Sequence, residues 1–199
     1  MRQVSVDELR DLATIARVPI WDAAKACGRD PKIYLHWSAG HYGSKFDDYH
    51  VNIDDQGRLW VEYSLDTTLA HTYMRNSGSV GISLCCGYQA TSNDLGPEPP
   101  TAAQIEAMAQ AIVAVADGLW LTIDRAHVMT HSEAADNCDY LTTHEPYGPN
   151  NGCERWDLQY LGTPESPKFL YNHDDPRTGG NVLRGKANFY RNEWRKSNA

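Results

Sequence analysis

The chain has 199 residues, of which 41% are hydrophobic and 22% are charged, as expected for one globular domain with an ordinary core. Its formal net charge of −8 argues against a nucleic-acid partner, because Lys and Arg provide most of the affinity for phosphates. No run reaches the roughly 18–20 apolar residues of a membrane-spanning helix, and residues 1–8 read as the start of a helix. We therefore expect a protein that is made in the cytoplasm without a signal peptide.

Capping boxes and apolar runs outline the elements of this domain. Ser5 and Glu8 form a capping box before an amphipathic pattern, and Thr101 and Gln104 form a second one. The apolar runs between them have the lengths and the bounding turns of strands. In chain order the sequence predicts a helix at about 5–17, a strand at 32–37, a hairpin of 49–53 and 58–63, a buried strand at 79–87, a helix from 101 to about 119 and a strand at 125–131.

The composition changes after Asp157, where prolines and paired glycines indicate an extended tail. Residues 162–199 hold seven Lys or Arg and four Asp or Glu, a charge of +3, whereas residues 1–161 carry 11 − 22 = −11. We therefore divide the chain into a catalytic domain, 1–161, and a basic C-terminal extension, 162–199. The extension either contacts an anionic wall or membrane surface, or packs on the domain as a short helix with its basic side in water.

Two histidines end predicted strands. His36 closes the strand at 32–37, and His131 closes the strand at 125–131. Ligands of α/β sheets gather at the carboxyl ends of strands, so the two imidazoles can converge. With a carboxylate from residues 154–157 they would form a zinc site that keeps one open position. The alternative is that both histidines are packed residues with satisfied nitrogens.

The order of several short motifs resembles a known family. The motifs are Leu35-His36-Trp37-Ser38, Tyr49-His50-Val51, Asn76 with the segment 79–84, and Thr130-His131-Ser132-Glu133. Together they resemble the type 2 N-acetylmuramoyl-L-alanine amidases over about residues 30–160. The resemblance implies an α/β fold with a mixed central sheet flanked by helices. It also implies a zinc hydrolase that acts on bacterial peptidoglycan, at the amide between N-acetylmuramic acid and L-alanine.

The resemblance also assigns roles to residues. It implies that His36, His131 and Asp157 are the zinc ligands and that Arg155 stabilises the oxyanion of the tetrahedral intermediate. Some relatives carry a glutamate at the position of Ser83, and the phage type uses a tyrosine instead, which matches Tyr49. We therefore assign Tyr49 to the reacting water or the developing oxyanion. Glu133 is the reserve general base.

A second departure from the family is an insertion at about 137–153. A disulfide between Cys138 and Cys153 would close it, with a stabilisation of roughly 3 kcal/mol. The other readings are free thiols in a packed loop, or metal ligation through Cys138, His144 or Cys153. Because some relatives use a cysteine as third ligand, Cys153 is also a rival to Asp157.

Aromatic residues near the motifs could line a groove for glycan or peptide. We expect Trp37, Tyr42 and His71 to bind substrate, although each could equally be a core or rim residue. The leading function is a monomeric phage or prophage endolysin, or another antibacterial lytic enzyme, that reaches peptidoglycan in the periplasm or wall after release. The alternatives are a muropeptide-binding module of the same fold without catalysis, and an unrelated zinc hydrolase of amides or esters.

Overall fold

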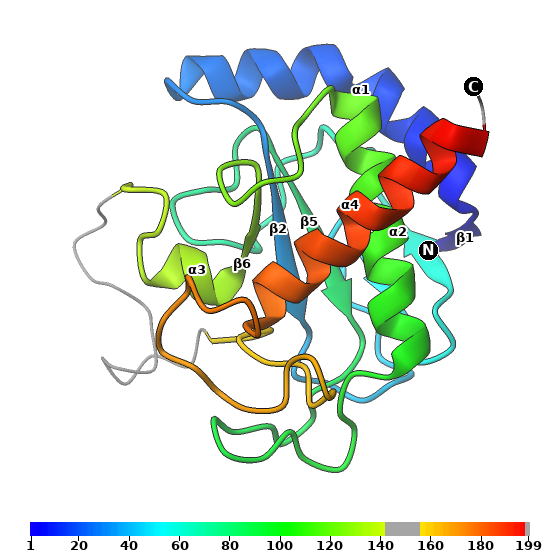
Figure 1. The fold of residues 1–199 in the computed structure, drawn as a ribbon. Helices are drawn as coiled ribbons and strands as arrows, with labels where there is room; N and C mark the ends of the chain where they lie inside the picture. Colours follow the sequence, from blue (N-terminus) through cyan, green and yellow to red (C-terminus); the bar gives the residue numbers. More distant parts are fainter. Residues whose placement is uncertain (142–155, 198–199) are drawn as a thin grey trace.

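The computed structural model describes residues 1–141 and 156–197 as one layered domain (Figure 1). A sheet of six strands has the order β1-β4-β3-β5-β2-β6. The strands are β1 (Arg2–Val4), β2 (Lys32–Trp37), β3 (Val51–Ile53), β4 (Leu59–Val61), β5 (Ser79–Leu84) and β6 (Val128–Thr130). The helices are α1 (Val6–Ala26), α2 (Ala102–Leu119), α3 (His131–Ala135) and α4 (Gly179–Ser197).

The sheet is mixed, as the family resemblance implied. Strands β3, β5, β2 and β6 run parallel to one another, whereas β4 pairs antiparallel with both β3 and β1. The antiparallel pair β3–β4 is the predicted hairpin, closed by Asp54, whose side chain accepts hydrogen bonds from the backbone of Gln56 and Arg58. The parallel half brings the carboxyl ends of β2, β5 and β6 to one edge of the sheet.

Alternation along the central strands separates a core face from a polar face. In β2, Ile33, Leu35 and Trp37 belong to the main core, while Tyr34 and His36 lie on the opposite side. Strand β5 follows the same pattern, with Val80, Ile82 and Leu84 in the core and Ser79, Gly81 and Ser83 facing away from it. The polar face is therefore set by the same period of two that builds the core.

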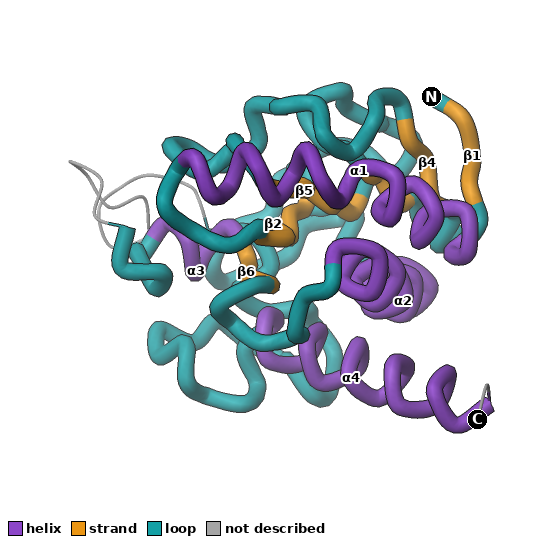
Figure 2. The backbone as a smooth tube through the Cα atoms, turned by 90° about the horizontal axis from the view of Figure 1, so that it is seen from above, coloured by secondary structure: helices purple, strands orange, loops and turns teal. Residues whose placement is uncertain are grey.

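Helix α2 lies between α1 and α4 (Figure 2). It is the most apolar helix of the described chain, and its buried side chains contact α1 and α4 as well as the sheet. Leu183 and Ala187 of α4 belong to the same core. In the described part of the chain, no helix is long and apolar enough to cross a membrane.

Elements near both ends of the chain differ from the sequence prediction. Residues 2–4 form the edge strand β1 instead of the beginning of a helix, and α1 continues nine residues beyond the expected end at about 17, through Pro19. Pro19 removes the hydrogen bond to the carbonyl of Ile15, but Ile15 is 75% exposed and water can replace that bond. The tail, expected to be largely extended or to pack on the domain as a short helix, contains the 19-residue helix α4, which packs on the domain and is longer than expected.

The cations of α4 are largely engaged with acidic side chains. Arg184 pairs with Glu133, Lys186 with Glu106, Arg191 with Asp117, and Lys196 with Glu193. The pair with Glu193 lies within α4, and the other three pairs hold the helix on the rest of the chain in addition to its apolar packing.

Candidate active site

Strand register brings the two predicted histidine ligands together. Strand β6 pairs parallel with β2, with Leu35 opposite Thr130, and the residue that follows each of these two is a histidine. His36 is the penultimate residue of β2, whereas His131 is the first residue of α3 instead of the end of a strand. Their Nδ1 atoms lie 3.1 Å apart.

Asp157 completes a cluster with these histidines. One of its carboxylate oxygens lies 3.3 Å from Nδ1 of His36, and the other lies 3.3 Å from Nδ1 of His131. Burial alone would favour the neutral acid, but the neighbouring imidazoles of His131 and His36 outweigh it and hold the pKa of Asp157 well below its usual range. The carboxyl is therefore an anion beside two imidazoles.

The donor set of this cluster fits zinc. Two ligand atoms that are each about 2.0–2.2 Å from a tetrahedral zinc ion lie about 3.3–3.6 Å apart. The 3.1 Å between the two nitrogens, and the 3.3 Å from each nitrogen to a different oxygen of the Asp157 carboxylate, are close to this spacing. Two imidazoles and one carboxylate also match catalytic zinc sites, which leave a fourth position open. Among the described residues, His36, His131 and Asp157 form a group whose ligand atoms lie close enough to one another to hold an ion.

The cluster opens into a pocket of about 440 Å³ on the polar face of the sheet. Tyr49 lines this pocket, and its ring centre lies 5.0 Å from that of His36. Trp37 and His71, both predicted to bind substrate, also line it. Tyr42 lies apart from the described pocket wall, where its hydroxyl donates to the carbonyl of Pro99.

Two buried histidines support the polar face behind the cluster. Burial lowers the pKa of His50 to about 4. Burial, together with the neighbouring His36 and His50, holds the pKa of His71 well below its usual range. Both rings are therefore neutral near pH 7.

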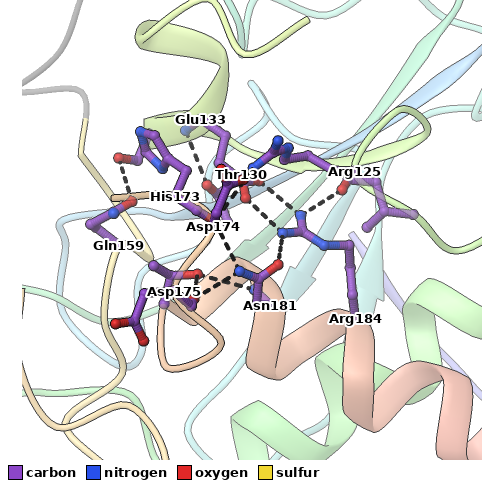
Figure 3. A network of polar contacts seen from close by, with 12 residues as sticks. Arg125, Thr130, Glu133, Gln159, His173, Asp174, Asp175, Asn181 and Arg184 are labelled. Atoms are coloured by element: carbon purple, nitrogen blue, oxygen red, sulfur yellow. Dashed lines mark hydrogen bonds and ion pairs between the residues drawn. The ribbon is translucent and has the colours of Figure 1, made fainter. Parts of the chain in front are cut away.

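Glu133 is engaged in the scaffold of α3 (Figure 3). Its carboxylate is 1% exposed and accepts two hydrogen bonds from Arg184 of α4, at 2.7 and 2.8 Å. It also accepts the backbone N–H of Thr130, which completes a capping box with that residue. Glu133 is absent from the described wall of the pocket. Through this network α4 supports the helix that begins with His131.

A second contact ties together the segments that carry His131 and Asp157. The hydroxyl of Ser132 donates to Oε1 of Gln159 at 2.8 Å, and both side chains are buried. The backbone N–H of Gly179, at the start of α4, donates to the carbonyl of Gln159. The segment that carries Asp157 is thus joined through Gln159 to α3 on one side and to the start of α4 on the other.

Several predicted residues lie outside the described part of the chain. They are Arg155, with its oxyanion role, and Cys153 and His144, with the disulfide and ligation readings of the insertion.

Sequence reasoning missed three side chains that support the cluster. They are Thr72, Gln159 and Arg184, which contact His36, Ser132 and Glu133 respectively. Only the spacing Thr130-x-x-Glu133 carried a local signal, that of a capping box before a helix. The partners of Thr72, Gln159 and Arg184 lie at least 27 residues away, so no local pattern indicates them.

Comparisons with known proteins give a family match and a distant structural likeness. A family model described as N-acetylmuramoyl-L-alanine amidase matches residues 21–147, which include His36 and His131 and end before Asp157. A search of curated proteins gives no match. Among solved structures, a similar one is the endolysine N-acetylmuramoyl-L-alanine amidase LysCS from Clostridium intestinale URNW. It is 15% identical, with 53% of this chain and 71% of that chain covered, at a TM-score of 0.40. A likeness this distant supports no statement about function.

Proposed function

The chain belongs to the N-acetylmuramoyl-L-alanine amidase family, whose model matches well over half of it, and from this premise we propose a zinc-dependent hydrolase. The chain is thus a peptidoglycan amidase. The proposed reaction is cleavage of the amide that joins N-acetylmuramic acid to the L-alanine of the stem peptide. The observation that carries the zinc proposal is the convergence of His36, His131 and Asp157 beside the pocket, whose wall includes His131 and Asp157.

These three residues would hold the ion through two ring nitrogens and a carboxylate oxygen. When bound, zinc supplies Lewis-acid polarisation of a carbonyl and of a water molecule. The protein contributes a fixed donor geometry, since His36 and Asp157 are buried and their segments are tied to neighbouring elements. It also contributes a pocket with Trp37 on its wall, which can exclude bulk water from the scissile amide.

Tyr49 is the side chain that we assign to proton handling or oxyanion stabilisation. It lines the pocket beside His36, as this role requires. Arg155 is proposed as a second oxyanion partner from its place two residues before Asp157. Glu133 is assigned to positioning instead of base catalysis, because Arg184 and the Thr130 N–H already engage its two oxygens.

The biological setting is proposed on the same premise. We assign the protein to the phage or prophage endolysins or other antibacterial lytic enzymes, acting as a monomer on peptidoglycan after release. Contact of the basic extension with an anionic surface stays a prediction. Arg184, Lys186, Arg191 and Lys196 form ion pairs, so such contact would depend on exposed cations of the extension such as Lys168 and Arg195.

Purified sacculi provide the test of this function. The protein should hold about one zinc per chain and should release new L-alanine amino termini, with activity lost on chelation and restored by zinc. Full activity after exhaustive chelation would refute the metal assignment. A muropeptide-binding module would sediment with sacculi without new amino termini. An unrelated hydrolase would cleave model amides or esters and leave sacculi intact.

Replacement of Tyr49 by phenylalanine should lower kcat by about 10²-fold while zinc content stays at the wild-type level. The reason is the loss of one transition-state hydrogen bond or proton carrier, since the ring that packs near His36 is kept. Rates on sacculi and zinc content, both measured on the purified variant, check this. Tyr63→Phe, at an exposed tyrosine outside the pocket wall, is the matched control. An unchanged kcat in Tyr49→Phe would remove the role from this residue.

A further inference from the structure

The two ring nitrogens of His36 have different neighbours. Nδ1 faces His131 and Asp157, whereas Nε2 lies 3.3 Å from the hydroxyl oxygen of Thr72. Thr72 belongs to the loop between β4 and β5 and is 2% exposed. A neutral imidazole carries its hydrogen on one nitrogen and a lone pair on the other, so the partner of Nε2 decides what Nδ1 presents.

Hydrogen bonds connect Ser79, His71, Thr72 and His36 in series, and the contact of Ser79 with the backbone decides which group donates in each bond. The Ser79 hydroxyl lies 2.8 Å from the backbone carbonyl of Asn76, which can only accept, so the hydroxyl donates there. Its oxygen is then an acceptor for Nε2 of His71, at 3.4 Å. His71 therefore carries its hydrogen on Nε2 and has a lone pair on Nδ1.

The same logic passes through Thr72. Its hydroxyl lies 2.9 Å from Nδ1 of His71, and because that nitrogen is an acceptor, the hydroxyl donates to it. The Thr72 oxygen can then accept a hydrogen from Nε2 of His36. His36 is thereby held with its hydrogen on Nε2 and its lone pair on Nδ1, toward Asp157.

The fold leaves space for the His71 ring and fixes the loop that carries His71 and Thr72. A Cβ at Gly81 of β5 would lie 2.7 Å from Cγ of His71, so only glycine admits the ring there. The side-chain oxygen of Asn76 accepts the backbone N–H groups of both His71 and Thr72, which fixes the loop. His71, Thr72 and Ser79 are each more than nine-tenths buried, so water does not compete for their hydrogen bonds.

We propose that Thr72 is a positioning residue that fixes the tautomer of His36, so that the imidazole meets the metal with a lone pair on Nδ1. The proposal deepens the proposed function and rests on its zinc site. Without the Thr72 hydroxyl, His36 can place its hydrogen on Nδ1, and the ion must then displace that hydrogen. Outer contacts of this kind typically contribute about 10–100-fold in metal affinity.

Two substitutions separate the hydroxyl from the shape of the side chain. Thr72→Val keeps the branched shape and removes the hydroxyl, while Thr72→Ser keeps the hydroxyl. Zinc titration against a competing chelator should show an affinity about 10–100-fold lower for Thr72→Val and close to wild type for Thr72→Ser. Equal zinc affinity in all three proteins would overturn the proposal.

The metal-free protein gives an independent reading. Nitrogen-15 NMR of labelled histidines distinguishes the two tautomers, and His36 should carry its hydrogen on Nε2 in wild type and Thr72→Ser. In Thr72→Val a fraction should move to Nδ1. A hydrogen on Nδ1 of His36 in metal-free wild type would refute the chain of bonds, even if Thr72→Val does not fold. Wild type that shows the Nε2 tautomer but binds no zinc would instead refute the proposed function.

Discussion

Replacement of Asp157 by alanine should abolish hydrolysis of peptidoglycan and release zinc. The variant removes one of three donors and leaves two imidazoles, which cannot hold the ion in a catalytic geometry. Loss of the metal removes several kcal/mol of transition-state stabilisation, so kcat/KM should fall by about 10³-fold or more. Zinc content and release of L-alanine amino termini are the two measurements. His36→Ala and His131→Ala should give the same result.

Two matched variants make the Asp157 result specific. Asp22→Ala removes an exposed carboxylate from α1 and should keep wild-type zinc content and activity. Cys153→Ser tests the rival ligand and should leave catalysis nearly intact. If Cys153→Ser loses the metal and Asp157→Ala keeps it, the third ligand is the thiolate.

Replacement of Arg184 by methionine should lower the free energy of unfolding by about 3–5 kcal/mol. The variant keeps most of the side-chain volume but leaves the Glu133 carboxylate, which is 1% exposed, without its guanidinium. Urea denaturation monitored by circular dichroism measures the change. Because Glu133 caps the helix that begins with His131, zinc affinity should also decrease.

A second variant separates the effect of the unpaired Glu133 charge on stability from the effect of lost side-chain packing. Arg184→Met combined with Glu133→Gln removes the unpaired charge, while the side-chain oxygen of the introduced glutamine can still accept the Thr130 N–H, so most of the stability should return. Arg195→Met, at an exposed position of α4, should change stability by less than about 0.5 kcal/mol. A loss below about 1 kcal/mol in Arg184→Met would show that the ion pair is dispensable.

The central elements were predictable because their signals are local. The apolar run 32–37 coincides with β2, and the capping box at Thr101 fixes the beginning of α2. Strand β1 escaped prediction because its three residues pair with β4, and the partner of Gln3 is Trp60, far along the chain. Helix α4 was predicted only in part, as a short helix packed on the domain, because its mean composition is polar and its glycines suggested an extended chain.

The residues of the site were likewise predictable where their signals are local and were missed where their partners are distant in the chain. His36 and His131 could be found from strand ends, since parallel pairing of β2 with β6 aligns them. Asp157 was suggested by the family resemblance, because the segment around it carries no periodic pattern. Thr72 and Arg184 were missed because their partners lie 36 and 51 positions away in the chain.

The ion pair between α3 and α4 also bears on the order in which the protein folds during synthesis. The ribosome makes Glu133 51 residues before Arg184. Until the later residue emerges, docking of α3 would bury a charge without a partner, which costs several kcal/mol. The nascent chain can form the sheet and the Thr72 contact first, whereas His131 is expected to settle only when α4 arrives. A hydrolase of the cell wall would then gain its metal site as one of the last steps of its own production.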